Sequence, residues 1–144
     1  MGDKGIERRL CQRFKIPGAT ISYRRVRIFA SPLGFDEEFC PVLDLSRGGV
    51  RFLTQKPMKV KAKVVLQVSI PGERIPLNLK GRIRWASFNP GKSYKYQAGV
   101  QFNAYGEEKN QNYPGALVKI IALEQKFIDP ANAEAADKAS EFSV

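Results

Sequence analysis

The chain has 144 residues, of which 43% are hydrophobic, and this size suits one domain with a single core. It carries 24 Lys and Arg against 14 Asp and Glu, which gives a formal net charge of +10. It contains no histidine, so the commonest general base and the commonest transition-metal ligand are both missing. We therefore expect no enzyme activity, no catalytic residues, no metal site and no cofactor.

Residues 1–18 are predicted to form a flexible basic arm, because they are rich in Arg and Lys and show no apolar periodicity. The arm lacks the apolar run of a secretion signal, and no later stretch approaches the roughly 20 apolar residues of a transmembrane helix. We therefore expect a cytoplasmic protein without membrane insertion. In that compartment Cys11 and Cys40 are expected to be free thiols.

Six β-strands are predicted between residues 19 and 103. In two of them, residues 64–70 and 77–85, apolar and polar residues alternate, which is typical of strands with one buried face. Trp85 falls on the apolar face of its strand, so core packing is predicted for it. The other predicted strands are residues 19–29, 39–45, 50–54 and 94–102. Short loops with Gly and Pro between the strands predict a closed antiparallel barrel.

After Pro114 the pattern becomes helical, with Leu117, Ile120 and Phe127 at helical spacing, and Asp129-Pro130 is expected to end the helix. The predicted organisation is an arm (1–18), a barrel (19–103), a linker with a C-terminal helix (104–129) and a tail (130–144). The tail holds three acids and one base, which leaves a net charge of +12 on residues 1–129. A domain this basic attracts polyanions, whether nucleic acid, acidic lipid or nucleotide.

Two short motifs carry binding chemistry: R-x-x-x-R in the arm, with a further arginine before it, and D-x-S-x-x-G after the second predicted strand. Each motif by itself can be explained without a ligand: the first as a solvent-exposed basic arm and the second as a tight turn. Guanidinium groups bind phosphate and the O6/N7 edge of guanine with paired hydrogen bonds. A carboxylate accepts from the guanine donors or orients an arginine, and a hydroxyl bonds a guanine amino group or a phosphate. Glycine lets a ligand approach the backbone. The candidate nucleotide-binding residues are Arg8, Arg9, Arg13, Asp44, Ser46, Gly48 and Gly49.

In this order, on a pattern of six strands, the two motifs resemble the two signatures of the PilZ domain family. Residues 81–85 and 98–102 resemble later strands of that family, and the resemblance covers roughly residues 7–103. It implies a mainly β fold, a six-stranded antiparallel PilZ-type β-barrel with a C-terminal α-helix, whose ligand is the bacterial second messenger cyclic di-GMP. For Trp85 it offers stacking near a guanine as the alternative to core packing.

The resemblance implies a receptor that changes conformation on binding cyclic di-GMP and signals to a downstream protein partner in motility, pili, exopolysaccharide or biofilm control. We expect the arm to be mobile without ligand and to close over the turn at residues 44–49 when ligand binds. Two alternatives stay open. One is a basic barrel that binds RNA or DNA, with Lys80, Arg82 and Arg84 on one strand face. The other is a ligand-free adaptor of pilus or flagellar machinery, against which the two intact motifs argue.

Overall fold

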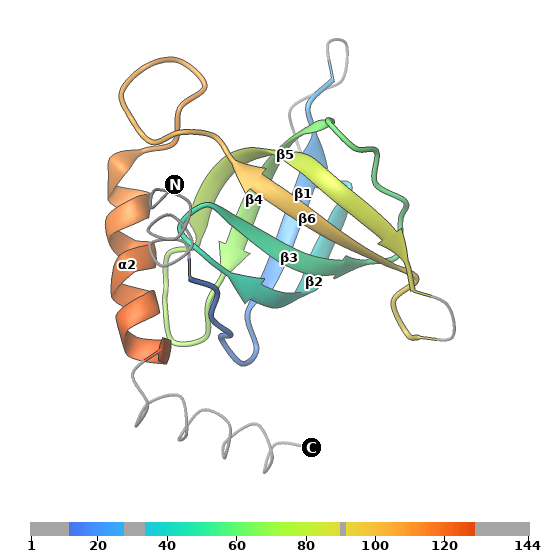
Figure 1. The fold of residues 1–144 in the computed structure, drawn as a ribbon, viewed down its shortest axis with the longest axis horizontal. Coiled ribbons are helices and arrows are strands. Elements are labelled where there is room, and N and C mark those ends of the chain that lie inside the picture. Colours follow the sequence, from blue (N-terminus) through green and yellow to red (C-terminus); the bar gives the residue numbers. More distant parts are fainter. Residues whose placement is uncertain (1–11, 28–33, 90–91, 129–144) are drawn as a thin grey trace, which may run out of the picture.

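The structure, a computed structural model, describes residues 12–27, 34–89 and 92–128 (Figure 1). These residues form a β-barrel that is followed in the chain by one helix. The elements are β1 (Thr20–Arg25), β2 (Glu37–Leu45), β3 (Gly49–Thr54), β4 (Lys63–Ser69), β5 (Leu77–Phe88), β6 (Tyr96–Phe102) and α2 (Pro114–Ile128). Neighbouring strands are antiparallel, and the barrel closes in the order β1-β2-β3-β6-β5-β4. The predicted fold class is confirmed.

The apolar faces of the strands fill the inside of the barrel. In β4 and in β5 up to Ile83, the predicted alternation is observed, and the polar residues between the buried ones face outward. The buried apolar side chains of these two strands are Val64, Leu66, Val68, Leu77, Leu79 and Ile83. Burying a large aliphatic side chain contributes about 1.5–3 kcal/mol, so this interior is the main stabilising feature of the barrel.

All six strands differ from the predicted ranges by at least one residue, and β2 begins at Glu37, two residues before the predicted start. Three other strands differ by two residues or more at one end. β1 stops at Arg25, because its partner β4 begins at Lys63 and the ladder ends there. β5 runs beyond Trp85 to Phe88, since it stays paired with β6. β6 begins at Tyr96, two residues later than residue 94, where a strand was predicted to start. In each case pairing with a neighbouring strand sets the end, and the local residue pattern does not.

The prediction of a flexible arm is wrong for residues 14–18. Phe14 and Ile16 are only 4% and 5% exposed and belong to the hydrophobic core. Gly18, with a φ of 81°, then turns the chain toward β1. The sequence hid this contact because two apolar residues among charged ones are too few to show a period. Residues 1–11, including Cys11, lie outside the described residues, as does the predicted tail at 130–144.

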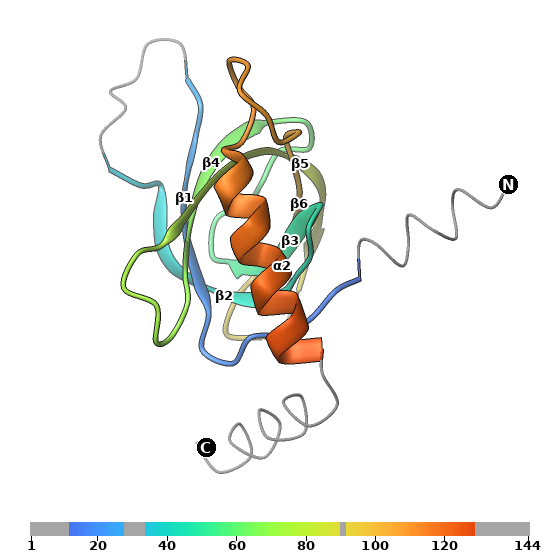
Figure 2. The same cartoon turned by 90° about the vertical axis from the view of Figure 1, so that its left-hand side faces the viewer.

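The predicted C-terminal helix is present as α2, which lies across one end of the barrel (Figures 1 and 2). It starts at Pro114, whose fixed φ and missing N–H suit the first helical turn. One stripe of the helix faces the barrel, as helical periodicity requires. The buried residues of this stripe are Ala116, Ile120, Leu123 and Glu124. An ion pair of 2.7 Å from Lys119 to Glu73 also ties the helix to the connection between β4 and β5.

A buried asparagine places the segment that leads into α2. Asn112 is 3% exposed, and its Oδ1 accepts from the backbone N–H of Lys80 at 2.7 Å. Its Nδ2 donates to the carbonyl oxygens of Lys80 and Asn103, both at 3.0 Å. These bonds hold the segment against β5 and the end of β6. Removing the amide would leave buried backbone groups unpaired, at a cost of about 1–3 kcal/mol for each.

Candidate functional site

The last residue of R-x-x-x-R and the D-x-S-x-x-G turn lie together at the end of β2. Phe14 and Leu45 exchange two backbone hydrogen bonds, from each N–H to the carbonyl oxygen of the other residue, both 2.9 Å long. Leu45 is the residue between Asp44 and Ser46. Arg13, the last arginine of R-x-x-x-R, directly precedes Phe14 and is exposed. The barrel thus brings Arg13 beside the D-x-S-x-x-G turn, while the predicted site residues Arg8 and Arg9 lie outside the described residues.

Ser46 closes the turn between β2 and β3. Its hydroxyl oxygen accepts from the backbone N–H groups of Gly48 at 3.2 Å and Gly49 at 3.1 Å, and the hydroxyl contacts the Gly49 carbonyl at 3.3 Å. Ser46 is only 7% exposed, and its own N–H donates to the same carbonyl at 2.8 Å. In this conformation the hydroxyl serves the turn, so a ligand would meet a surface that Ser46 has already organised.

Gly49 is glycine for a reason that the sequence does not show. A Cβ atom at this position would lie 2.3 Å from the carbonyl oxygen of Val100 in β6. The backbone of β6 cannot rotate away as a side chain could, so the pairing of β3 with β6 requires glycine here. We expected Gly49 to lack a side chain so that a ligand could approach, but strand pairing alone is enough to require glycine at this position. Gly48 lies in the same turn, where its carbonyl accepts from the N–H of Phe102 at 2.8 Å.

Asp44 holds an arginine that the sequence reasoning missed. One carboxylate oxygen of Asp44 accepts from Arg51 Nε at 2.7 Å and also from Arg51 Nη2. Asp44 is 5% exposed, whereas the side chain of Arg51 keeps 34% of its surface exposed. The hydrogen bond to Asp44 raises the pKa of Arg51 above its ordinary value. Of the two roles expected for Asp44, contact with guanine or orientation of an arginine, the structure displays the second.

The antiparallel pairing of β2 with β3 could have predicted the contact between Asp44 and Arg51. Asp44 and Arg51 are direct cross-strand partners in the hairpin of β2 and β3, where facing side chains lie about 4.5–5.5 Å apart at Cβ. The neighbours of Arg51 in β3, Val50 and Phe52, are buried. Because side chains alternate along a strand, Arg51 points outward. An acid and a base on either side of a predicted tight turn were the available signal.

The same row continues across the barrel to Trp85. Arg51 faces Gly99 in β6, and Gly99 in turn faces Trp85 in β5. A Cβ atom on Gly99 would lie 2.2 Å from Trp85 Nε1, so the indole lies directly over this glycine on the outside of the barrel. Trp85 is partly exposed, and the prediction that it packs in the core is wrong. The cause is a shift of register between Ile83 and Trp85, which turns the later side chains to the other face.

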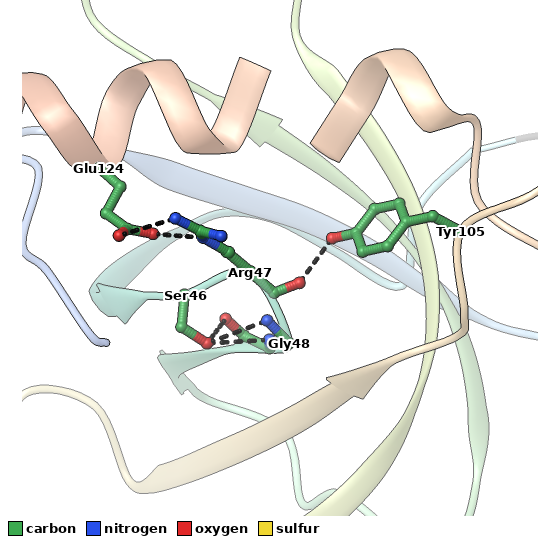
Figure 3. A network of polar contacts seen from close by, with 6 residues as sticks. Ser46, Arg47, Gly48, Tyr105 and Glu124 are labelled. Atoms are coloured by element: carbon green, nitrogen blue, oxygen red, sulfur yellow. Dashed lines mark hydrogen bonds and ion pairs between the residues drawn. The ribbon is translucent and has the colours of Figure 1, made fainter. Parts of the chain in front are cut away.

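Arg47, inside the D-x-S-x-x-G motif, ties the turn to α2 (Figure 3). Its Nε donates to Glu124 Oε2 at 2.8 Å and its Nη2 to Glu124 Oε1 at 3.3 Å. Its carbonyl oxygen accepts from the hydroxyl of Tyr105 at 2.6 Å. The sequence reasoning assigned no role to these three residues. The available signal for this contact was an acidic residue on the buried stripe of the predicted helix, and it did not indicate which base Glu124 would contact.

Three arginines therefore lie at or beside the turn: Arg13 exposed, Arg47 bound to a helix carboxylate and Arg51 bound to a strand carboxylate. Guanidinium groups suit phosphate and guanine edges, and the partly exposed indole of Trp85 suits stacking with a planar base. The arrangement fits an anionic ligand with aromatic bases.

The family described as PilZ domain matches the chain over residues 7–118. A search of the curated proteins found no match. One similar solved structure is the inhibitor of motility MotI/DgrA of Bacillus subtilis, with a TM-score of 0.54 and 13% identity over 78% of this chain and 48% of that one. Another is MrkH of K. pneumonia in complex with c-di-GMP, with a TM-score of 0.57 and 16% identity over 86% of this chain and 54% of that one. The chain spans about half the length of both structures.

Within the ranges that the structure describes, no helix combines the length and the apolar character needed to cross a bilayer.

Proposed function

The chain belongs to the PilZ domain family, and from that premise we propose that it is a receptor for cyclic di-GMP. The proposed site is the outer surface around the β2–β3 turn, with the outward-facing row of Arg51, Gly99 and Trp85 beside it. PilZ domains are ligand-binding effector domains, so the protein is proposed to act by binding and not by catalysis. Cyclic di-GMP is an intracellular messenger, and we accordingly place the receptor in the cytoplasm.

One observation carries the proposal. The backbone pairing of Phe14 with Leu45 puts the end of R-x-x-x-R against the middle of D-x-S-x-x-G. The last residue of one motif thus lies beside the middle of the other, although the two motifs are about 30 positions apart in the chain and each is weak evidence by itself. Arg8 and Arg9 lie only a few residues before Arg13, within reach of the same surface, because an extended chain spans up to about 3.3–3.6 Å per residue.

The chemistry of the surface matches the ligand in two respects. The guanidinium groups of Arg13 and the arm can pair with the two phosphates and with the O6/N7 edges of the guanines. Trp85 presents an indole face, on which a guanine can stack with about 1–3 kcal/mol of binding free energy. Asp44 is proposed to hold Arg51 in place for the same ligand.

Isothermal titration calorimetry at physiological salt tests the proposal, with cyclic di-GMP and cyclic di-AMP as the two ligands. Adenine places an amino donor where guanine has O6, so an arginine would meet a donor. Each bidentate contact discriminates by about 1–3 kcal/mol, so cyclic di-GMP should bind about five- to 150-fold more tightly. Equal binding of both ligands, or binding of neither, would refute the receptor.

A second candidate is a polyanion-binding barrel. Lys80, Arg82 and Arg84 are exposed along β5, and Arg82 faces the exposed Lys63 of β4. Such a surface binds RNA or DNA with affinity that falls steeply as salt rises. Arg82→Ala is the discriminating variant, because it should weaken RNA binding and leave cyclic di-GMP binding intact. Tight, salt-sensitive RNA binding that Arg82→Ala abolishes would favour this second function.

Beyond binding, we propose that the liganded form signals to a downstream protein partner. The structurally similar MotI/DgrA is an inhibitor of motility, which makes motility a process to test first. Pili, exopolysaccharide and biofilm are the other candidate outputs. A pull-down with the pure protein, with and without cyclic di-GMP, should capture a partner in one condition only.

A further inference from the structure

The side chain of Arg47 points away from its own turn to a carboxylate of α2 (Figure 3). The two contacts to Glu124, at 2.8 and 3.3 Å, form the paired geometry that a guanidinium also adopts with a phosphate. Glu124 is 9% exposed, and its side chain 12%, so this carboxylate is largely withdrawn from water. An anion thus already occupies the guanidinium that lies inside the ligand-binding motif.

The backbone of the turn does not depend on this contact. Tyr105 binds the carbonyl oxygen of Arg47 at 2.6 Å, and the Ser46 hydroxyl holds the N–H groups of Gly48 and Gly49. The guanidinium of Arg47 can therefore exchange its anionic partner by rotating its side chain, while the turn keeps its shape. No change of backbone is needed for a ligand to take over the contact.

We propose that Arg47 is a further nucleotide-binding residue, and that Glu124 is the internal anion that the ligand displaces from it. This inference rests on the proposed receptor function. When Arg47 turns to a phosphate or a guanine edge, Glu124 becomes a buried carboxylate without its cation, which is costly. The helix relieves that cost by moving Glu124 into water. Ligand binding at the turn and docking of α2 on the barrel end therefore oppose each other, and each shifts the population of the other state.

The remaining contacts of α2 allow such a shift. The stripe that docks the helix is short, with Ala116, Ile120 and Leu123 as its buried apolar residues. Within the described residues, α2 makes a second ion pair in addition to the one between Glu124 and Arg47. It joins Lys119 to Glu73, on the connection between β4 and β5. That pair provides a matched control, because it also anchors α2 but does not involve the ligand turn.

Calorimetric titration with cyclic di-GMP on a set of variants tests the coupling. Glu124→Gln removes the charge and keeps the shape, so it should raise affinity about five- to tenfold, at the lower end of coupling between linked sites. Arg47→Gln should lower affinity, and adding Glu124→Gln to it should bring no gain, since the two residues act as one pair. Lys119→Gln loosens α2 without freeing Arg47 and should raise affinity by less than Glu124→Gln does, because an exposed ion pair contributes little to docking.

Hydrogen exchange on the parent protein gives an independent readout. Amides of residues 117–127 should lose protection when cyclic di-GMP binds, while those of β4 keep theirs. A parent that binds cyclic di-GMP with unchanged α2 protection would overturn the coupling, as would a folded Glu124→Gln variant with parental or weaker affinity, and the receptor function would stand in both cases. Binding by Glu124→Gln alone would support the coupling. Binding by neither protein would overturn both proposals.

Discussion

Replacing Phe14 with alanine isolates the contact that joins the two motifs. The side chain is 4% exposed and packs in the core, and removing a buried phenylalanine costs about 3–5 kcal/mol. The N–H of Leu45 donates to the carbonyl oxygen of Phe14, so this amide exchanges with solvent only when the segment detaches. If the segment opens separately from the barrel, losing about 3 kcal/mol of its stability should speed exchange of the Leu45 amide by about 150-fold.

Amide exchange followed by NMR measures this effect residue by residue. Lys15→Ala, a change at an exposed neighbour, is the matched control and should leave the Leu45 amide at its parental rate. Amides of β4 should be unaffected in both variants. Affinity for cyclic di-GMP should fall in Phe14→Ala, because Arg13 loses its fixed place. A parental exchange rate at Leu45 would refute the anchoring role, and equal acceleration in β4 would refute separate opening of the segment.

Three further predictions concern single residues. Arg13→Ala should weaken cyclic di-GMP binding more than about tenfold, since charge-assisted hydrogen bonds contribute about 1.5–3 kcal/mol, and it should leave the melting temperature unchanged because Arg13 is exposed; parental affinity by calorimetry would remove Arg13 from the site. Gly99→Ala should displace the indole of Trp85, the only tryptophan, and shift its fluorescence, because the added Cβ would lie 2.2 Å from Nε1; an unchanged emission spectrum would contradict the placement. Cys40 should resist thiol reagents at about pH 8, near the usual pKa of a thiol, because burial and then the charge of Glu37 raise the pKa of Cys40 to about 12; labelling as fast as in urea would argue against a buried thiol.

Local patterns were enough to predict the barrel and its helix. Alternation along residues 64–70 and 77–83 reports which face of a strand is buried, and helical spacing after Pro114 reports the docking stripe of α2. Both periods depend only on backbone geometry, so they can be read without knowing what lies opposite. The two motifs could also be recognised from the sequence, because each falls within six consecutive residues.

The partners of the site residues were decided by tertiary structure. Trp85 lies outside the predicted core because a shift in the pairing of β5 with β6 turns its side chain to the outer face. No residue of its own strand indicates that shift. Phe14 joined the core through backbone bonds to Leu45. Arg47 found Glu124 at a sequence separation of 77 residues. Each of these contacts depends on how the closed barrel positions distant segments. A sequence lists the charges and rings that a site can use, while the closure of the sheet determines which of them meet.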